Sequence, residues 1–360
     1  MTIFSREDSQ FLTYLRSLSI LVIVFGHIGL FWVFKPYSEF LHVFMPIFFF
    51  ISGAVSYGSY CRSGNLFKYY KKRFVSLLVP YYLLVFVQFS VFIWANMGVS
   101  NLSFSDLLRW IFIIPNNAIM PFSIGHVWFL HTLFILVLVS PFYFHLFRLN
   151  KKYTILIIFF AIIMSFVQMF VDVSDKMVFF HNNLFKPLVH SCFFLFGVLV
   201  FHAKCCTRNK DLILLLLGSI GISVALVKHL QINIDYDFHT YAPDLFYVSG
   251  SFAAIAVMLL CKHLLIKLIS SFTLEKLFSF LHRHTYSIYL IHVPVLSLWF
   301  YLFAQSGAEV KSLKYGLLKM LFVLVGTVIP SVPFTYVSSY VVEKAFFFLG
   351  KERSKPKGHL

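Results

Sequence analysis

The segment LTYLRSLSILVIVFGHIGLFW, residues 12–32, is long and apolar enough to cross a membrane, yet it contains Arg16 and His27. An ionisable side chain in the middle of a membrane-spanning helix costs about 2.5–3.5 kcal/mol or more, so it is retained where it pairs, lines a cavity or takes part in chemistry. Eleven positions separate the two residues. On an α-helix this spacing brings them within about 20° of the same face and roughly 16 Å apart along the axis. The segment therefore predicts a membrane helix that presents a cation and an imidazole on one side, at two depths.

The composition extends this prediction to the whole chain. Of its 360 residues, 59% are hydrophobic, only 12% are charged and 47 are Phe, which excludes a soluble domain with an ordinary polar surface. A helix needs about 20 mostly apolar residues to cross a bilayer. About ten stretches meet this requirement: 11–34, 40–60, 74–95, 125–147, 153–171, 187–203, 211–228, 243–262, 285–304 and 315–342. We therefore expect an all-α, polytopic membrane protein embedded in the lipid bilayer.

The net charge of +16 is concentrated in alternate connections between these stretches, which argues against a nucleic-acid partner. Short loops rich in Lys and Arg mark the cytoplasmic side of a membrane protein. One set of connections carries Arg6, Arg62, Lys68, Lys71, Lys72, Arg73, Arg148, Lys151, Lys152, Lys204, Arg208, Lys210, Lys262, Lys267, Lys276, Arg283 and a basic end from Lys344 to Lys357. The other set carries only Lys35, Arg109, Lys176, Lys186, Lys228, Lys311, Lys314 and Lys319. We therefore expect both termini in the cytoplasm, with a transmembrane domain over 1–345 and a basic cytoplasmic tail over 346–360.

Several other kinds of segment and site lack support. The first apolar stretch is too long for a cleavable signal peptide and is followed by no small-residue cleavage site. The chain has no Gly-rich phosphate loop and no Gly-x-Ser-x-Gly motif. Its five cysteines are predicted to stay reduced and are not spaced as zinc ligands, so we expect neither a disulfide nor a metal. In the longest outward connection, 96–124, we expect an amphipathic helix that begins at Ser103 or Ser105, ends before Pro115 and lies on the membrane as a lid.

Four motifs follow one another along the chain. The first is YLRSLSILVIVFGH, residues 14–27, in which ten residues separate the Arg from the His. The others are PIFFFISG at 46–53, GHVWFL at 125–130 and HTYSIYLIHVP at 284–294. In content and order they resemble the acyltransferase-3 family of integral membrane acyltransferases. The resemblance covers most of the chain.

The resemblance implies transfer of an acyl group, most often acetyl from cytoplasmic acetyl-CoA, to a hydroxyl of a surface carbohydrate such as O-antigen in the bacterial inner membrane. Acetyl-CoA is an anionic nucleotide on an extended pantetheine arm, so its site needs cations at the cytoplasmic surface and a narrow apolar slot. Lys71, Lys72 and Arg73 supply such cations, and Arg16 lies about one turn deeper. The family's basic stretch has a second Arg where this chain has Ser76, and Lys71 or Lys72 can substitute for it.

His27 is the candidate general base. A neutral imidazole can take the proton from a sugar hydroxyl as the oxygen attacks the thioester, and we expect burial to keep the ring neutral. The roughly 16 Å between Arg16 and His27 is comparable to the pantetheine arm, so the thioester is expected near His27. Two structural alternatives stand beside these roles: a histidine that packs between helices and an arginine that snorkels to the headgroups. Covalent catalysis through an acetyl-imidazole is also open.

Other residues are weaker candidates. His126 and Trp128 open the third motif and could contact the acceptor, although a Trp at this depth is commonly an interface anchor. His292 could meet the site or serve the fold. Ser52 and Gly53 are expected to allow close helix packing. Four further ionisable residues lie near or within expected spans: His131, His190, His239 and Asp244.

Two other functions fit a basic protein with many spans. A transporter of an anionic solute would be expected to have paired, Gly- or Pro-broken helices at the midplane, which the sequence does not show. A scaffold for glycan assembly without activity would bind no acyl-CoA. Thioester consumption by the purified protein separates these alternatives from the enzyme.

Overall fold

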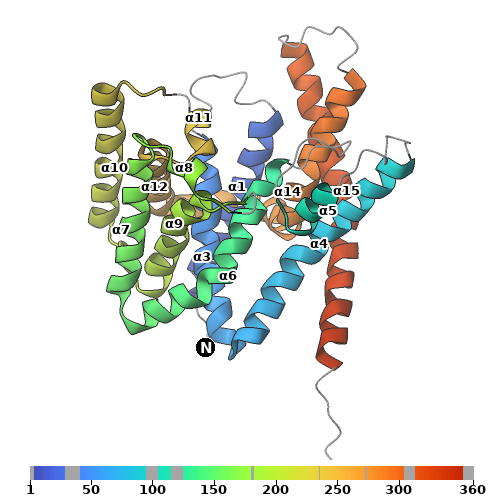
Figure 1. Ribbon diagram of the computed structural model, residues 1–360, viewed down its shortest axis with the longest axis horizontal. Coiled ribbons are helices and arrows are strands. Elements are labelled where there is room, and N and C mark those ends of the chain that lie inside the picture. Colours follow the sequence, from blue (N-terminus) through green and yellow to red (C-terminus); the bar gives the residue numbers. More distant parts are fainter. Residues whose placement is uncertain are drawn as a thin grey trace, which may run out of the picture.

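The protein is a bundle of long helices (Figure 1). A computed structural model describes residues 4–28, 41–94, 104–114, 125–179, 182–234, 236–271, 274–303 and 313–351. The helices are α1 (Arg6–Ile28), α3 (Phe44–Ser63), α4 (Leu66–Trp94), α5 (Phe104–Ile111), η3 (Gly125–Val127), α6 (Trp128–Leu149), α7 (Lys151–Val167), α8 (Val173–Lys176), α9 (Phe185–His202), α10 (Asn209–Leu230), α11 (Tyr236–Tyr241), α12 (Leu245–Leu260), α13 (Lys262–Ser271), α14 (Glu275–Phe303) and α15 (Leu313–Lys351). The strands in these ranges are β1 (Val178–Phe179) and β2 (Asn182–Asn183), which pair antiparallel as a short hairpin.

Each of the expected apolar stretches contains a helix, which confirms an all-α polytopic membrane protein. Among the described residues, eight helices are individually long and apolar enough to cross a membrane. Helices α12 and α13, which meet at a bend of 59°, pass the same test only as a pair, so the described residues contain at most nine candidate spans. Helix α7 has 17 residues, a length of about 26 Å at 1.5 Å per residue. The end of the first expected stretch, 29–34, lies outside the described residues.

Two further expectations, the helix in the longest outward connection and the domain boundary, can also be compared with the structure. The helix expected between Ser103 and Pro115 is confirmed as α5, and its main chain accepts hydrogen bonds from two tyrosines of α4 at the Trp110 and Ile111 carbonyls. Its role as a lid stays a prediction. Helix α15 continues past the domain boundary expected at residue 345, as far as Lys351. The remainder of the expected tail, 352–360, is not among the described residues.

Basic connections gather on one side of the bundle, which we call the basic side. Asp8 at the start of α1 accepts hydrogen bonds from Lys204, which follows α9, and from Lys262, which begins α13, at 3.1 and 2.7 Å. The α3–α4 and α6–α7 turns and the end of α15 lie along the same lower edge in Figure 1. The first and last described helices thus begin and end on one side, which is the arrangement that the loop charges predict.

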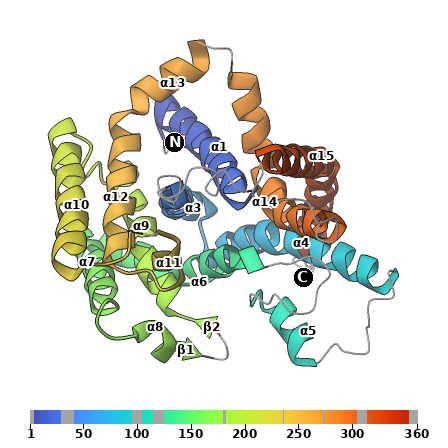
Figure 2. The ribbon, with the colours of Figure 1, turned by 90° about the horizontal axis from the view of Figure 1, so that it is seen from above.

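Helix α3 runs through the middle of the bundle (Figure 2) and crosses α9 at very short range. A Cβ added at Gly53 of α3 would lie 1.8 Å from the Phe194 carbonyl oxygen, and one added at Gly197 of α9 would lie 2.0 Å from the Phe50 carbonyl oxygen. Small residues at membrane helix contacts let two backbones approach in this way. The packing role expected for Gly53 is confirmed.

Replacing Gly53 with Ala should therefore destabilise the folded protein, because a methyl group cannot fit against a backbone carbonyl. Overpacking of this kind typically costs about 1–3 kcal/mol and sometimes more. The measurement is the apparent Tm of the detergent-extracted protein. Gly218→Ala on α10, where an added Cβ meets nothing within 4 Å, is the matched control. Equal Tm values for the two variants would show that the α3–α9 crossing does not require glycine.

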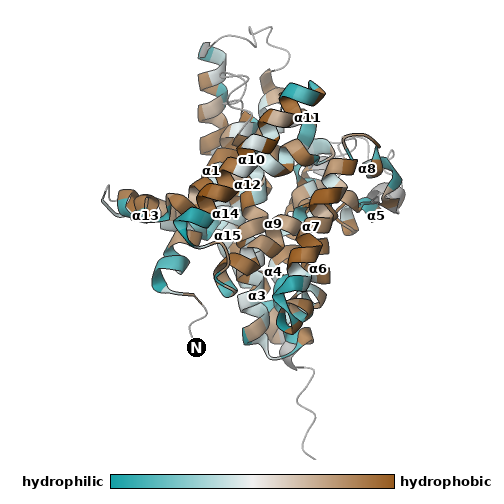
Figure 3. Cartoon of the chain, turned by 90° about the vertical axis from the view of Figure 1, so that its left-hand side faces the viewer, coloured by the Kyte–Doolittle hydropathy of each residue, from teal (hydrophilic) through white to brown (hydrophobic). Residues whose placement is uncertain are grey.

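The outer surface of the bundle is suited to lipid. Large apolar side chains on α7 and α10 point away from the neighbouring helices; Leu156 is 61% exposed and Leu214 is 69% exposed. Figure 3 shows hydrophobic residues along most of the length of the long helices, with hydrophilic residues mainly toward their ends. Apolar surface of this extent is stable in a bilayer and not in water. The outer surface of the bundle is therefore the face that meets lipid.

Candidate functional site

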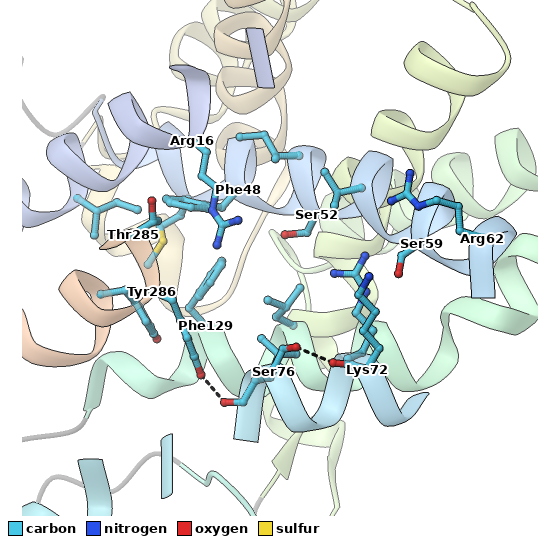
Figure 4. Close-up of a pocket in the computed structure, with 18 residues that line it drawn as sticks. Arg16, Phe48, Ser52, Ser59, Arg62, Lys72, Ser76, Phe129, Thr285 and Tyr286 are labelled. Atoms are coloured by element: carbon cyan, nitrogen blue, oxygen red, sulfur yellow. Dashed lines mark hydrogen bonds between the residues drawn. The ribbon is translucent and has the colours of Figure 1, made fainter. Parts of the chain in front are cut away.

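A cavity of about 320 Å³ penetrates the bundle between α1, α3, α4, α6 and α14 (Figure 4). It is lined by Arg16, Ile23, Met45, Phe48, Ile51, Ser52, Val55, Ser59, Arg62, Lys72, Arg73, Ser76, Leu77, Phe129, Leu133, Thr285, Tyr286 and Tyr289. Arg62 and Lys72, at the α3–α4 turn, are both exposed. The cavity therefore begins at the basic side and extends toward the centre of the membrane.

Four cations line this cavity: Arg16, Arg62, Lys72 and Arg73. None of its described lining residues is acidic. The Arg73 guanidinium lies 5.9 Å from the centre of the Tyr69 ring, and its Nε and Nη2 atoms are buried without a hydrogen-bond partner among the described residues. A buried guanidinium is costly unless its donors are satisfied. The arrangement is thus suited to an anionic ligand that accepts these hydrogen bonds.

The inner part of the cavity is mostly apolar. Ile23, Met45, Phe48, Phe129 and Leu133 all contribute to its wall. Its charged entrance and apolar interior would suit a ligand with an anionic head and a long, thin tail.

The inner end of the cavity lies next to three histidines. Ile23 is one helical turn before His27 on α1, and Tyr289 is about one turn before His292 on α14. The third histidine, His126, is in η3. Its ring centre is 5.2 Å from that of His292, and its carbonyl accepts a hydrogen bond from Tyr289 Oη at 2.6 Å. The cavity therefore ends about one turn short of this group of side chains.

His27 and His292 form a direct pair. Their ring planes are within 9° of parallel, with centres 5.0 Å apart, and His27 Nδ1 lies 2.7 Å from His292 Nε2. His292 is completely buried, whereas His27 is exposed. The expectation that His27 is buried is therefore wrong; the residue lies in the last turn of α1. The buried member of the pair is His292.

The hydrogen-bond network assigns a tautomer to each ring of the pair. His292 Nδ1 lies 2.7 Å from the Tyr289 carbonyl oxygen and 3.2 Å from that of Ile288. A carbonyl oxygen only accepts, so in the neutral ring Nδ1 carries the proton and Nε2 is the acceptor. His27 Nδ1 must then donate to His292 Nε2. This makes His27 Nε2 the basic nitrogen, the arrangement that a general base requires.

The structure brings together most of the residues predicted to bind the donor. Arg16, Lys72 and Arg73 line one cavity, and Figure 4 shows Arg16 and Lys72 pointing into it from different helices. Ser76 also lines it and donates to the Lys72 carbonyl at 2.7 Å. Lys71 lies elsewhere: its Nζ is 3.4 Å from the carbonyl oxygen of residue 346 in α15.

Arg62 is a lining cation that the motifs did not identify. A helical pattern could have indicated it: Ser52, Val55, Ser59 and Arg62 recur at intervals of three or four residues and all line the cavity. The pattern places Arg62 on the same face of α3 as Ser52, the serine of the motif at 46–53. The motif itself ends at residue 53, well before this position.

The remaining candidates serve the fold or another cavity. His190 contacts the Lys186 carbonyl at 2.7 Å and Tyr247 Oη at 3.3 Å. His239 is hydrogen-bonded to Asp244, which in turn caps the start of α12. Trp128 and His131 line a second cavity on the opposite side of α6, which is described below.

Comparison with known proteins identifies the family. The family model described as an acyltransferase domain, acyltransferase-3, matches residues 9–337. No curated protein and no solved structure matches the chain. Because the family model covers nearly all of the helical bundle, the chain belongs to the acyltransferase-3 family and is a membrane-embedded acyltransferase.

Proposed function

We propose that the protein moves an acyl group, typically acetyl, from cytoplasmic acyl-CoA to a hydroxyl of a surface polysaccharide or its lipid-linked precursor, such as O-antigen, in the bacterial inner membrane. The observation that carries this proposal is the cavity that is lined by four cations and ends about one helical turn from the His27–His292 pair. Family membership identifies an enzyme, so we do not retain the transporter and scaffold alternatives.

The cavity supports acyl-CoA as the donor. The phosphates of CoA would be bound by Arg62, Lys72 and Arg73 at the basic side, where guanidinium groups offer paired donors. The pantetheine arm would follow the apolar wall past Arg16. Helix α1 is continuous from Arg6 to Ile28, so Arg16 and His27 are roughly 16 Å apart along it. This length would bring the thioester to His27.

The proposed reaction is a direct transfer. His27 Nε2 takes the proton of the acceptor hydroxyl while the hydroxyl oxygen forms a bond to the thioester carbonyl carbon. The carbon–sulfur bond then breaks, and the CoA thiolate leaves with the proton from the His27 imidazolium. The products are the O-acyl saccharide and CoA thiol. His292 acts as a positioning residue, because its Nε2 holds His27 in the reactive tautomer.

Replacing His292 with Phe should lower kcat without changing the affinity for acetyl-CoA. The ring volume is kept, but the acceptor for His27 Nδ1–H is lost, so His27 can adopt the other tautomer and other orientations. We expect a decrease of about 10–100-fold, the range found for groups that orient metal-bound histidines. The measurement is kcat together with the acetyl-CoA Kd, and His292→Gln, which can still accept a hydrogen bond, should recover part of the loss. A His292→Phe enzyme with the parental kcat would remove the positioning role.

The function itself is tested with purified protein in lipid nanodiscs. The donor is acetyl-CoA labelled in the acetyl group, and the acceptor is surface polysaccharide from a host strain that lacks this gene. We expect label to enter the polysaccharide with release of one CoA thiol per acetyl group. Parallel reactions with succinyl-CoA and other acyl-CoAs identify the preferred donor. Absence of thioester consumption with every acyl-CoA would contradict the proposal.

A further inference from the structure

A second cavity, of about 360 Å³, lies on the side of the bundle opposite the basic side. It is formed at the starts of α6 and α9 together with α8, β2 and α11, and α9 ends on the basic side, next to Lys204. Figure 2 shows α8 and the β1–β2 hairpin close to the α6–α9 region, away from α14 and α15. With the basic side in the cytoplasm, the second cavity lies at the outward face of the membrane.

Helix α6 is a shared wall between the two cavities. Phe129 and Leu133, four residues apart, line the cationic cavity, whereas Trp128 and Thr132, also four residues apart, line the second cavity. Residues four apart share a helix face, and adjacent residues are about 100° apart around the axis. Trp128 is also only two residues after His126, whose ring contacts that of His292. The second cavity is therefore next to the inner end of the first.

The lining of the second cavity combines aromatic rings with polar groups. Lys186 Nζ lies 4.9 Å from the centre of the Trp128 ring and 5.9 Å from that of Tyr241. The carboxyl groups of Asp172 and Asp175 and the side chain of Asn183 belong to the same lining. An aromatic ring provides an apolar face, while carboxylate and ammonium groups bind hydroxyls in defined directions. Saccharides present both kinds of surface, apolar C–H faces and a ring of hydroxyl groups.

The loop that supplies these polar groups is fixed in place by its own hydrogen bonds. The Gln168 side-chain oxygen accepts from the backbone N–H groups of residues 173 and 174, at 2.9 and 2.8 Å. Asn183 donates to Ser174 Oγ at 2.6 Å and accepts from the backbone N–H groups at the start of α9. The site is therefore formed before a ligand binds, which reduces the entropy lost on binding.

The charge of the lining favours a neutral ligand. A hydrogen bond from the Gln168 amide, followed by one from the Asp175 backbone N–H, holds the pKa of Asp172 below its usual range, so this carboxylate is ionised at neutral pH. Asp172 and Asp175 together outweigh the single Lys186, which disfavours a phosphate or another anion. Among the described residues no group of three His, Cys, Asp or Glu side chains could hold a metal ion.

We propose that this second cavity binds a neutral sugar of the acceptor and holds the saccharide so that a neighbouring hydroxyl reaches His27. The inference rests on the proposed function, since it names the place where the acceptor of that reaction is recognised. Donor and acceptor would then approach the histidine pair from opposite sides of the membrane, with α6 between their two sites.

Tyr241→Ala is the sharpest test. The Tyr241 side chain is 75% exposed, so its removal takes no packing from the core. Phe238→Ala is the matched control, because Phe238 is on the same short helix, is 69% exposed and does not line the cavity. The probe is the repeat-unit oligosaccharide released by mild acid from the surface polysaccharide of the gene-deletion strain.

With this oligosaccharide and labelled acetyl-CoA, Tyr241→Ala should raise the KM for the oligosaccharide about tenfold. The acetyl-CoA Kd and kcat at saturating oligosaccharide should stay at the parental values, and Phe238→Ala should leave all three unchanged. A parental KM in Tyr241→Ala, or an equal rise in both variants, would overturn the acceptor site while the proposed function stands. If the parent protein consumes no acyl-CoA thioester with either the oligosaccharide or the intact polysaccharide, the proposed function is wrong and the acceptor assignment falls with it.

Discussion

Replacing His27 with Asn is expected to lower the rate of acyl transfer by about 10²–10⁴-fold, the usual cost of losing a general base. Asn can still donate to His292 Nε2, so the contact between α1 and α14 is kept, but it offers no basic nitrogen near neutral pH. His27 is exposed, and the substitution should leave folding and membrane insertion intact. The measurements are kcat and the acetyl-CoA Kd of protein in nanodiscs.

The control for this variant is His263→Asn. His263 is an exposed residue on α13 that pairs with Glu7 on the basic side, so its replacement makes the same chemical change away from the cavity. We expect parental transfer from the control. If His27→Asn, present at normal abundance, transfers acyl groups within a few-fold of the parent, His27 is a structural residue. The base would then have to be sought at His126 or His292.

The second large effect is expected on donor affinity. Arg73→Ala should weaken acetyl-CoA binding about ten- to a hundredfold, because each charge-assisted hydrogen bond contributes roughly 1.5–3 kcal/mol. Arg73→Lys should recover only part of this loss, since an ammonium cannot reproduce the two-pronged geometry of a guanidinium. Arg16→Ala should also weaken binding, because this residue lines the same cavity. Equilibrium titration with acetyl-CoA gives the Kd of each variant.

Lys71→Ala is the matched control, since it removes a positive charge from the same helix two residues away. Lys71 lies against α15 and does not line the cavity, so its loss should leave the Kd close to the parental value. A Kd that is unchanged in both Arg73→Ala and Arg16→Ala would mean that the basic cluster only orients the protein in the membrane. A loss of the same size in all three variants would point to the overall charge of this surface and not to a defined site.

The sequence was sufficient to predict the fold class and the gathering of the basic connections on one side of the bundle. Apolar runs of about 20 residues can only be stable as membrane helices, and loop charge follows insertion; both effects are local. The close packing at Gly53 was also predictable from its small size. The 59° bend between α12 and α13 was not, because the apolar stretch at 243–262 ends where the chain turns and does not indicate the direction of the helix that follows.

The candidate site was predictable only in part. The Arg–His spacing on α1 gave the depth of the two groups, since a helix has a fixed rise per residue. The pairing of His27 with His292 joins residues 265 positions apart, and no sequence period relates two helices at that separation. The direction of the Lys71 side chain depends on α15, and the accessibility of His27 depends on how the end of α1 meets its neighbours. Tertiary packing decides each of these.

The central claim is that one ligand bridges the cations of the basic side and His27. Its most direct test is a cryo-EM structure of the protein with acetonyl-CoA, in which a CH₂ group inserted between the sulfur atom and the carbonyl carbon turns the thioester into a ketone, so that transfer cannot occur. We predict that the CoA phosphates bind Arg73 and its neighbouring cations and that the ketone carbonyl lies beside His27, close enough for the base to reach an attacking hydroxyl. Phosphate density on the opposite side of the membrane, or a carbonyl more than about 10 Å from His27, would contradict the account.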